Sequence, residues 1–169
     1  GTTTVGSVLN PLQIPGLLSA RLRANDGDGL ARSSQLIFTN AGVLETNQDF
    51  NRFVGTNANN VTWTGSGGFA YWNGVVTGDG SVPSAVPGNL NVTLSGNQPL
   101  FWGAFGFVPV GSALVFGAKD ATGSVTFTNN ILTGLAGVLP LTTVNITVVR
   151  NDAQTNVLEP GLSIAENID

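Results

Sequence analysis

The chain has 169 residues, a formal net charge of −4 at pH 7, and no cysteine, methionine or histidine. Six cationic side chains cannot neutralise a row of phosphates, so no nucleic acid is expected as a partner, and the lack of cysteine excludes disulfides and thiolate metal sites. With 41% hydrophobic and 9% charged residues, the chain is too apolar for disorder and long enough for one full core.

The first 16 residues predict an N-terminal arm or donor strand. They have strand character up to Leu9, after which Pro11 and Pro15 interrupt any hydrogen-bonded ladder. The candidate assembly residues of this arm are Thr2, Thr3, Thr4, Val5, Val8 and Leu9. The chain does not begin with methionine, which fits either removal of a signal peptide or a trimmed sequence.

Most of the following chain alternates apolar and polar residues, as half-buried strands do. The Asn73-Gly74 dipeptide adds a type I′ hairpin signal. Together with the stretch described next, these segments give about ten strands at the spacing of a sandwich or jelly roll. Strands are predicted over residues 18–24, 35–40, 60–64, 69–76, 89–95, 124–128, 142–149 and 161–168.

Residues 99–118 form the most apolar stretch and contain no charged side chain. Its length suits a membrane helix, but Pro109 and four glycines argue against a membrane span. We expect two strands, about 100–108 and 112–117, that need cover on both faces, one of them from another subunit. The candidate assembly residues here are Phe101, Trp102, Phe105 and Phe107.

These patterns predict an all-β fold, an antiparallel β-sandwich or jelly roll with extended terminal segments. The sandwich is expected over residues 17–150, followed by a linker and a C-terminal strand over 151–169. No internal repeat of fixed period is found, so a β-solenoid ranks below the sandwich. The predicted core residues are Val61, Leu90, Val92, Leu94, Val125, Phe127, Val144, Ile146 and Val148.

The turn at residues 25–29 contains the best candidate metal ligands. Asp26 and Asp28 are closely spaced carboxylates on a glycine-rich turn, which suits calcium. The spacing does not match an EF-hand loop, and the alternative, a plain polar turn, is favoured. No other cofactor is indicated.

Three asparagines, Asn60, Asn91 and Asn145, fit the N-glycosylation pattern on predicted polar strand faces. A chain this rich in Asn, Thr and Ser reaches that number of sites by chance, so the count carries no information. A sugar-stacking platform could be formed by Trp63, Tyr71, Trp72 and Trp102, with Trp72 or Trp63 as the main candidate, although aromatic side chains in a sandwich more often belong to the core. Serine has no histidine partner and the acids are scattered, so we expect no enzyme.

The C-terminal residues 143–169, TVNITVVRNDAQTNVLEPGLSIAENID, resemble the junctions of tandem β-repeats in bacterial and archaeal cell-surface proteins. The overall composition resembles jelly-roll filament subunits such as biofilm-matrix fibres and archaeal bundling pili. In those families a terminal strand of one subunit completes the sheet of its neighbour, so the resemblance implies donor-strand assembly.

The sequence therefore favours an extracellular or cell-surface structural protein, a self-assembling subunit of a filament, pilus-like fibre or surface layer. The expected partners are copies of itself, with surface glycans as a further possibility. One alternative is a carbohydrate-binding or adhesin module. A viral jelly-roll capsid protein is another, although its usual basic arm is missing from residues 1–15.

Overall fold

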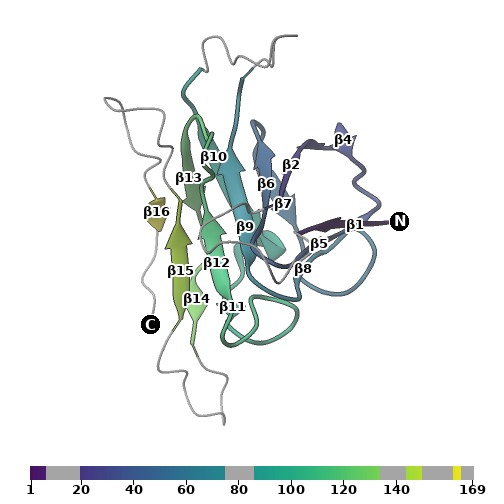
Figure 1. The fold of residues 1–169 in the computed structure, drawn as a ribbon. Helices are drawn as coiled ribbons and strands as arrows, with labels where there is room; N and C mark the ends of the chain where they lie inside the picture. The colour runs from purple at the N-terminus through teal and green to yellow at the C-terminus, as the bar shows by residue number, and fades with distance from the viewer. Residues whose placement is uncertain (7–19, 75–85, 134–143, 150–161, 165–169) are drawn as a thin grey trace, which may run out of the picture.

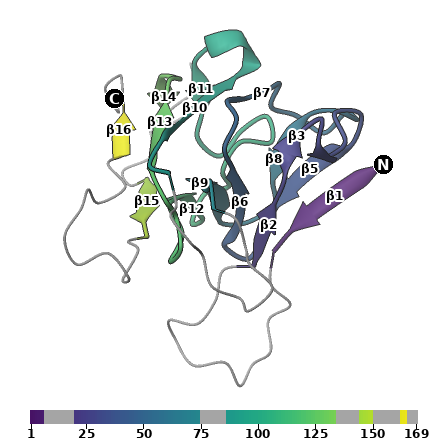
Figure 2. The ribbon, with the colours of Figure 1, turned by 90° about the horizontal axis from the view of Figure 1, so that it is seen from above.

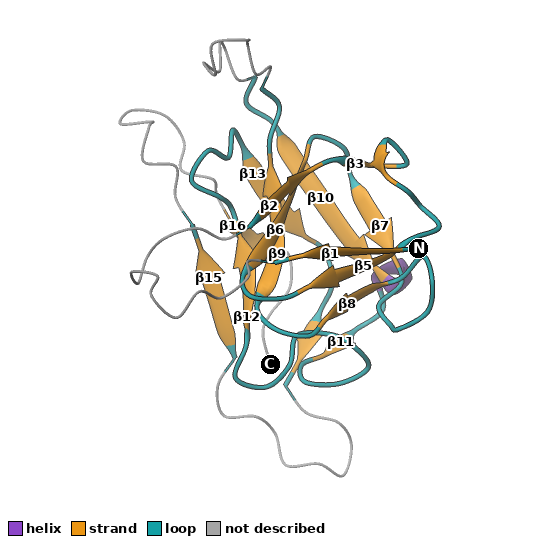
Figure 3. Ribbon diagram, turned by 45° about the vertical axis from the view of Figure 1, so that its right-hand side comes forward, coloured by secondary structure: helices purple, strands orange, loops and turns teal. Residues whose placement is uncertain are grey.

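The structure is a computed structural model that describes residues 1–6, 20–74, 86–133, 144–149 and 162–164. Strands dominate it, and its one helical element in these ranges is the short 3-10 turn η1 (Ser95–Asn97) (Figure 3). None of the described residues form a helix long and apolar enough to cross a bilayer.

Three larger sheets carry the fold (Figure 1). The three-stranded sheet has the order β1 (Thr2–Val5), β5 (Gln35–Phe38) and β8 (Val61–Trp63). The five-stranded sheet has the order β15 (Asn145–Val148), β12 (Ala113–Phe116), β9 (Gly67–Tyr71), β6 (Gly42–Thr46) and β2 (Arg21–Arg23). The four-stranded sheet has the order β16 (Leu162–Ile164), β13 (Ser124–Phe127), β10 (Asn89–Leu94) and β7 (Phe50–Arg52).

Two short pairs complete the described strands. One joins β11 (Leu100–Phe101) to β14 (Ile131–Leu132), and the other joins β3 (Asn25–Asp26) to β4 (Gly29–Leu30). A tight turn at residues 27 and 28 joins β3 to β4, and Leu30 at the end of β4 is fully buried in the main core.

The chain visits the three larger sheets in turn and then returns to the first. It passes β5, β6 and β7 in one circuit and β8, β9 and β10 in the next, and equivalent strands of successive circuits pair in parallel. Every pairing within the three larger sheets is parallel. The architecture is therefore a β-solenoid, in which each circuit stacks on the one before.

The prediction of an antiparallel sandwich or jelly roll is wrong, because alternation identifies the buried side chains but not the direction of the neighbouring strand. Leu90, Val92 and Leu94 of β10 alternate with half-exposed or exposed residues, yet both neighbours of β10 run parallel to it. Parallel strands are usually covered on both faces and read as continuous apolar runs. Here the outer face of the four-stranded sheet is partly open, so its strands carry the alternation typical of antiparallel sheets.

The sequence shows no repeat of fixed period because successive circuits of the solenoid differ in length. Leu44 pairs with Phe69, 25 residues later, whereas Gly67 pairs with Leu114, 47 residues later. Leu114 in turn pairs with Ile146, 32 residues further along. The extra residues lie between the strands, so the stacking is preserved while the period is not. The Asn73-Gly74 hairpin is also wrong, since β9 pairs in parallel with β6 and β12.

One aromatic core lies between the three larger sheets. Phe69 contacts Phe38 of the three-stranded sheet and Phe50 of the four-stranded sheet, with ring centroids 5.1 and 4.9 Å apart. Phe116 and Phe127 join the five- and four-stranded sheets in the same way at 5.7 Å. The core prediction is confirmed for Val61, Leu90, Val92, Leu94, Val125 and Phe127; Val144 and Ile146 are half-buried, and Val148 is 43% exposed.

The charge-free stretch over residues 99–118 forms one of its two predicted strands. β12 is confirmed, but the first strand is reduced to the two residues of β11, and turns follow as far as residue 111. Trp102 and Phe107 are buried in the chain's own core, whereas Phe105 is 70% exposed. The stretch is therefore covered mainly by its own chain, and a neighbouring subunit is not needed for that purpose.

Both terminal strands belong to the chain's own sheets. β1 pairs with β5 over Thr2–Val5, and β16 pairs with β13 over Leu162–Ile164. This arrangement contradicts the expectation that one of these segments is donated to a neighbouring subunit. Val8, Leu9 and residues 151–160, which were predicted as a linker, lie outside the described residues.

Candidate functional site

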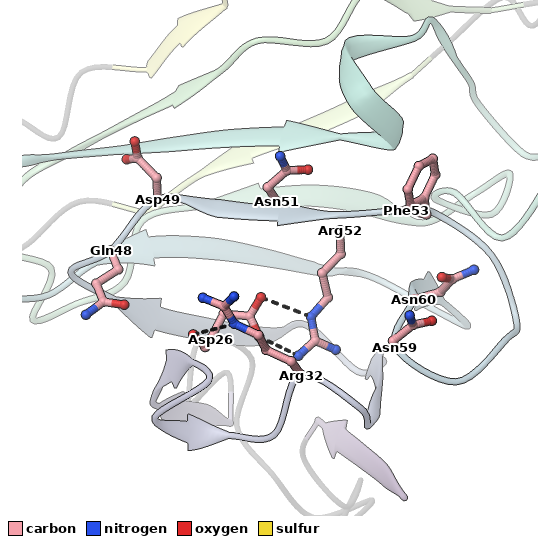
Figure 4. A pocket seen from close by; sticks show the side chains of 9 residues that line it. All are labelled: Asp26, Arg32, Gln48, Asp49, Asn51, Arg52, Phe53, Asn59 and Asn60. Carbon is pink, nitrogen blue, oxygen red and sulfur yellow. Dashed lines mark hydrogen bonds and ion pairs between the residues drawn. The ribbon is translucent and has the colours of Figure 1, made fainter.

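A polar hollow of about 430 Å³ runs along β7, which is the edge strand of its sheet (Figure 4). Side chains from both faces of β7 border the hollow, and the β3–β4 turn lies across from the strand. The lining residues are Asp26, Arg32, Gln48, Asp49, Asn51, Arg52, Phe53, Asn59 and Asn60.

Arg52 connects β7 to the β3–β4 turn. Its Nη2 lies 2.6 Å from Oδ1 of Asp26, its Nε donates a longer bond of 3.4 Å to Oδ2, and its Nη1 and Nη2 donate to the main-chain oxygens of Ser34 and Ala31. The Arg52 side chain is nearly buried, as expected for a guanidinium whose donors are used in several directions. This side chain therefore fixes the wall of the hollow.

Four amide side chains around the hollow differ from Arg52 in their hydrogen bonding. Those of Gln48, Asn51, Asn59 and Asn60 make no hydrogen bond to any other residue that the structure describes. An amide carries both a donor and an acceptor, so the four side chains leave polar groups of both kinds available to a ligand.

The remaining lining side chains differ in how firmly they are held. Oδ1 of Asp49 accepts hydrogen bonds of 3.0 Å from the main-chain nitrogen and from Nδ2 of Asn91. Arg32 is exposed, and within the described part of the chain its side chain donates one long bond of 3.4 Å to the Asp26 carbonyl. Phe53, the single apolar residue of the lining, is 66% exposed.

A second, smaller hollow of about 230 Å³ lies beside Trp72, next to a charged cluster on the outer face of the five-stranded sheet. Nε of Arg23 donates to Oε2 of Glu45 at 2.6 Å, and both Arg21 and Arg23 pair with Asp120. Burial raises the pKa of Glu45 above its ordinary value of 4.5, and the hydrogen bond and charge of Arg23 offset part of that rise. We call Arg21, Arg23, Glu45 and Asp120 the outer charged cluster.

The two predicted calcium ligands are not arranged around a common point. Asp26 is paired with Arg52 and lines the larger hollow, whereas Asp28 is exposed and lines the smaller one. The described ranges contain no group of three acidic side chains that could hold a metal ion. Calcium binding at this turn stays a prediction that the geometry of Asp26 does not favour.

The glycosylation candidates lie in three different settings. Asn60 is half-buried at the rim of the larger hollow, the Asn91 side chain is engaged with Asp49, and Asn145 is exposed on β15. Their modification stays a prediction. The proposed sugar platform is not available: Trp63 is buried in the core, and Arg23 covers the Trp72 ring at 4.3 Å from its centroid.

Sequence reasoning did not select Phe53 or Asn51, although the local pattern held the signal. Phe50 and Arg52 point inward while Asn51 and Phe53 point outward, as strand alternation requires. The alternation is hard to recognise in the sequence because a charged residue, Arg52, occupies an inward position. The ion pair of Arg52 with Asp26 explains why that position is inward.

Comparisons with protein-family models, with curated proteins and with solved structures find no match to this chain.

Proposed function

We propose that the chain is an extracellular structural protein whose copies associate end to end into a filament or surface layer. The low charge and the Thr- and Asn-rich composition favour a cell-surface location, as the sequence suggested. The mode of assembly differs from donor-strand exchange, because both terminal strands are already paired within the chain. What remains for assembly is the open edge of each stacked sheet.

The exposed and uncharged edge strand β15 is the observation that supports this proposal. β15 is the edge strand of the five-stranded sheet, and its Val148 is 43% exposed, although its register partner Phe116 is buried. β15 also carries no charged side chain, which is the usual protection of an edge strand. A further strand stacked on β15 would cover Val148 and pair the main-chain groups of its outer edge, which no other described strand pairs.

The edge of the same sheet opposite β15 is a different surface, because it carries two arginines that both pair with Asp120 within the chain. That edge is β2, and β2 and β15 are the two end strands of the five-stranded sheet (Figure 2). Contact between β15 of one copy and β2 of the next joins two different surfaces. A contact of this kind produces an open chain of subunits rather than a closed dimer.

A proline in β15 tests the proposal, because it removes an edge N–H. Val149 donates to the Phe116 carbonyl, so in a parallel ladder the N–H of Val148 points to the free edge. We expect wild-type protein and Val148→Ile to form extended particles by negative-stain microscopy and light scattering, and Val148→Pro to remain monomeric with an unchanged circular dichroism spectrum. Particles formed by Val148→Pro at wild-type yield, or a monomeric wild type, would contradict the proposal.

A further inference from the structure

The charges around the larger hollow balance each other. Arg32 and Arg52 contribute two positive charges and Asp26 and Asp49 two negative ones, and Arg52 is paired directly with Asp26. Such a lining offers no net attraction to a phosphate, a nucleic acid or a polycation. The ligand that suits it is uncharged.

The polar groups of the lining are suited to hydroxyl groups. The amides of Gln48, Asn51, Asn59 and Asn60 make no hydrogen bond to another described residue, and each offers a donor and an acceptor. A hydroxyl group also donates and accepts, so a polyhydroxylated molecule can satisfy several of these amides together. Small-ligand sites of about 300–1,000 Å³ are usually apolar, whereas only one of the nine residues here is.

That one apolar residue, Phe53, presents its ring to the rim of the hollow. Phe53 directly follows β7, and its ring projects on the same side of the chain as Asn51 and on the opposite side from Arg52 (Figure 4). The face of an aromatic ring is electron-rich and attracts the weakly positive C–H groups of a pyranose ring. An exposed aromatic ring beside unused amides can therefore hold the apolar face of a sugar and bind its hydroxyl groups.

From these observations we propose that the hollow along β7 binds a neutral oligosaccharide. A peptide strand is less suitable, because β7 has only three residues and offers few edge hydrogen bonds. The saccharide site is separate from the β15 edge that carries the proposed assembly, so either proposal can fail without the other.

The test measures binding of neutral hexopyranose oligosaccharides, namely cello-, malto- and chito-oligosaccharides, by saturation-transfer NMR and titration calorimetry. Oligogalacturonate and inorganic phosphate serve as anionic probes. We expect at least one neutral oligosaccharide to bind, and Phe53→Ala to weaken its binding about tenfold. Asn51→Ala is expected to weaken the same complex.

Phe105→Ala is the matched control, since Phe105 is a similarly exposed phenylalanine outside the hollow. Phe105→Ala should bind the oligosaccharide as tightly as the wild type does. Phe53→Ala, Asn51→Ala and Phe105→Ala should all keep the wild-type melting temperature, because the three side chains are exposed. The proposal is overturned if no neutral oligosaccharide binds, if only the anionic probes bind, or if Phe53→Ala binds as the wild type does.

Discussion

The two faces of the five-stranded sheet are stabilised in different ways. Toward the solenoid interior, Leu44, Phe69 and Leu114 pack into the aromatic core. On the outer face, Val43, Ala70 and Val115 form a smaller buried cluster. Adjacent residues of one strand thus belong to two separate apolar clusters, and both faces of this sheet are covered, as is usual for parallel sheets.

Charge is the main difference between the faces. The outer charged cluster places a buried carboxylate, Glu45, between Arg21 and Arg23, and its Oε1 has no hydrogen-bond partner. The inner face contains no comparable group among its described residues, and its stability comes from non-directional burial. We therefore expect the inner face to respond mainly to lost volume and the outer face to charge and pH.

The largest expected effect comes from removing volume at the inner face. Phe69→Ala deletes a fully buried ring that contacts Phe38, Phe50 and Trp63, and should lower the free energy of unfolding by about 3–5 kcal/mol. The loss in the free energy of unfolding is measured by urea unfolding followed by tryptophan fluorescence. Phe105→Ala removes an exposed ring of the same size and should change stability by at most about 0.5 kcal/mol. Similar losses for the two variants would show that the core is assigned wrongly.

Removing a charge from the outer face should have a smaller effect. Arg23→Gln removes the 2.6 Å bond to Glu45, so the charge of the buried carboxylate is less well stabilised. We expect the free energy of unfolding to fall by about 1–3 kcal/mol. The double variant Arg23→Gln/Glu45→Gln should recover part of that loss, because the buried charge is then absent. A double variant no more stable than Arg23→Gln alone would show that Arg23 acts through packing on Trp72 instead.

The smallest effect is a dependence of stability on pH. Because burial raises the pKa of Glu45, the folded carboxyl holds its proton to higher pH than the unfolded one. This contribution to stability is complete below pH 4.5, the ordinary pKa, and is lost as pH rises through the raised pKa. Melting temperatures of the wild type relative to Glu45→Gln should therefore fall as pH increases over that window. Parallel curves for the two proteins would rule out this role for Glu45.

The sequence predicted the positions of several strands and much of the core. Leu36, Ile37 and Phe38, and the alternating residues of β10 and β13, were assigned correctly because alternation follows directly from the strand backbone. The candidate site was predicted less well. Of the residues around the larger hollow, Asp26 and Asn60 were selected for reasons other than the hollow, and Phe53 was not selected at all.

By itself, the sequence determined that this is an all-β chain with one large apolar core, because composition and alternation reflect local backbone geometry and burial. Tertiary structure decided which strands pair and in which direction, because those choices depend on residues 22 to 47 positions apart and on connections of unequal length. It also decided that Arg52 points inward to Asp26 while Phe53 points outward. No local pattern specifies such a pairing, since the two partners meet only when successive circuits of the solenoid stack.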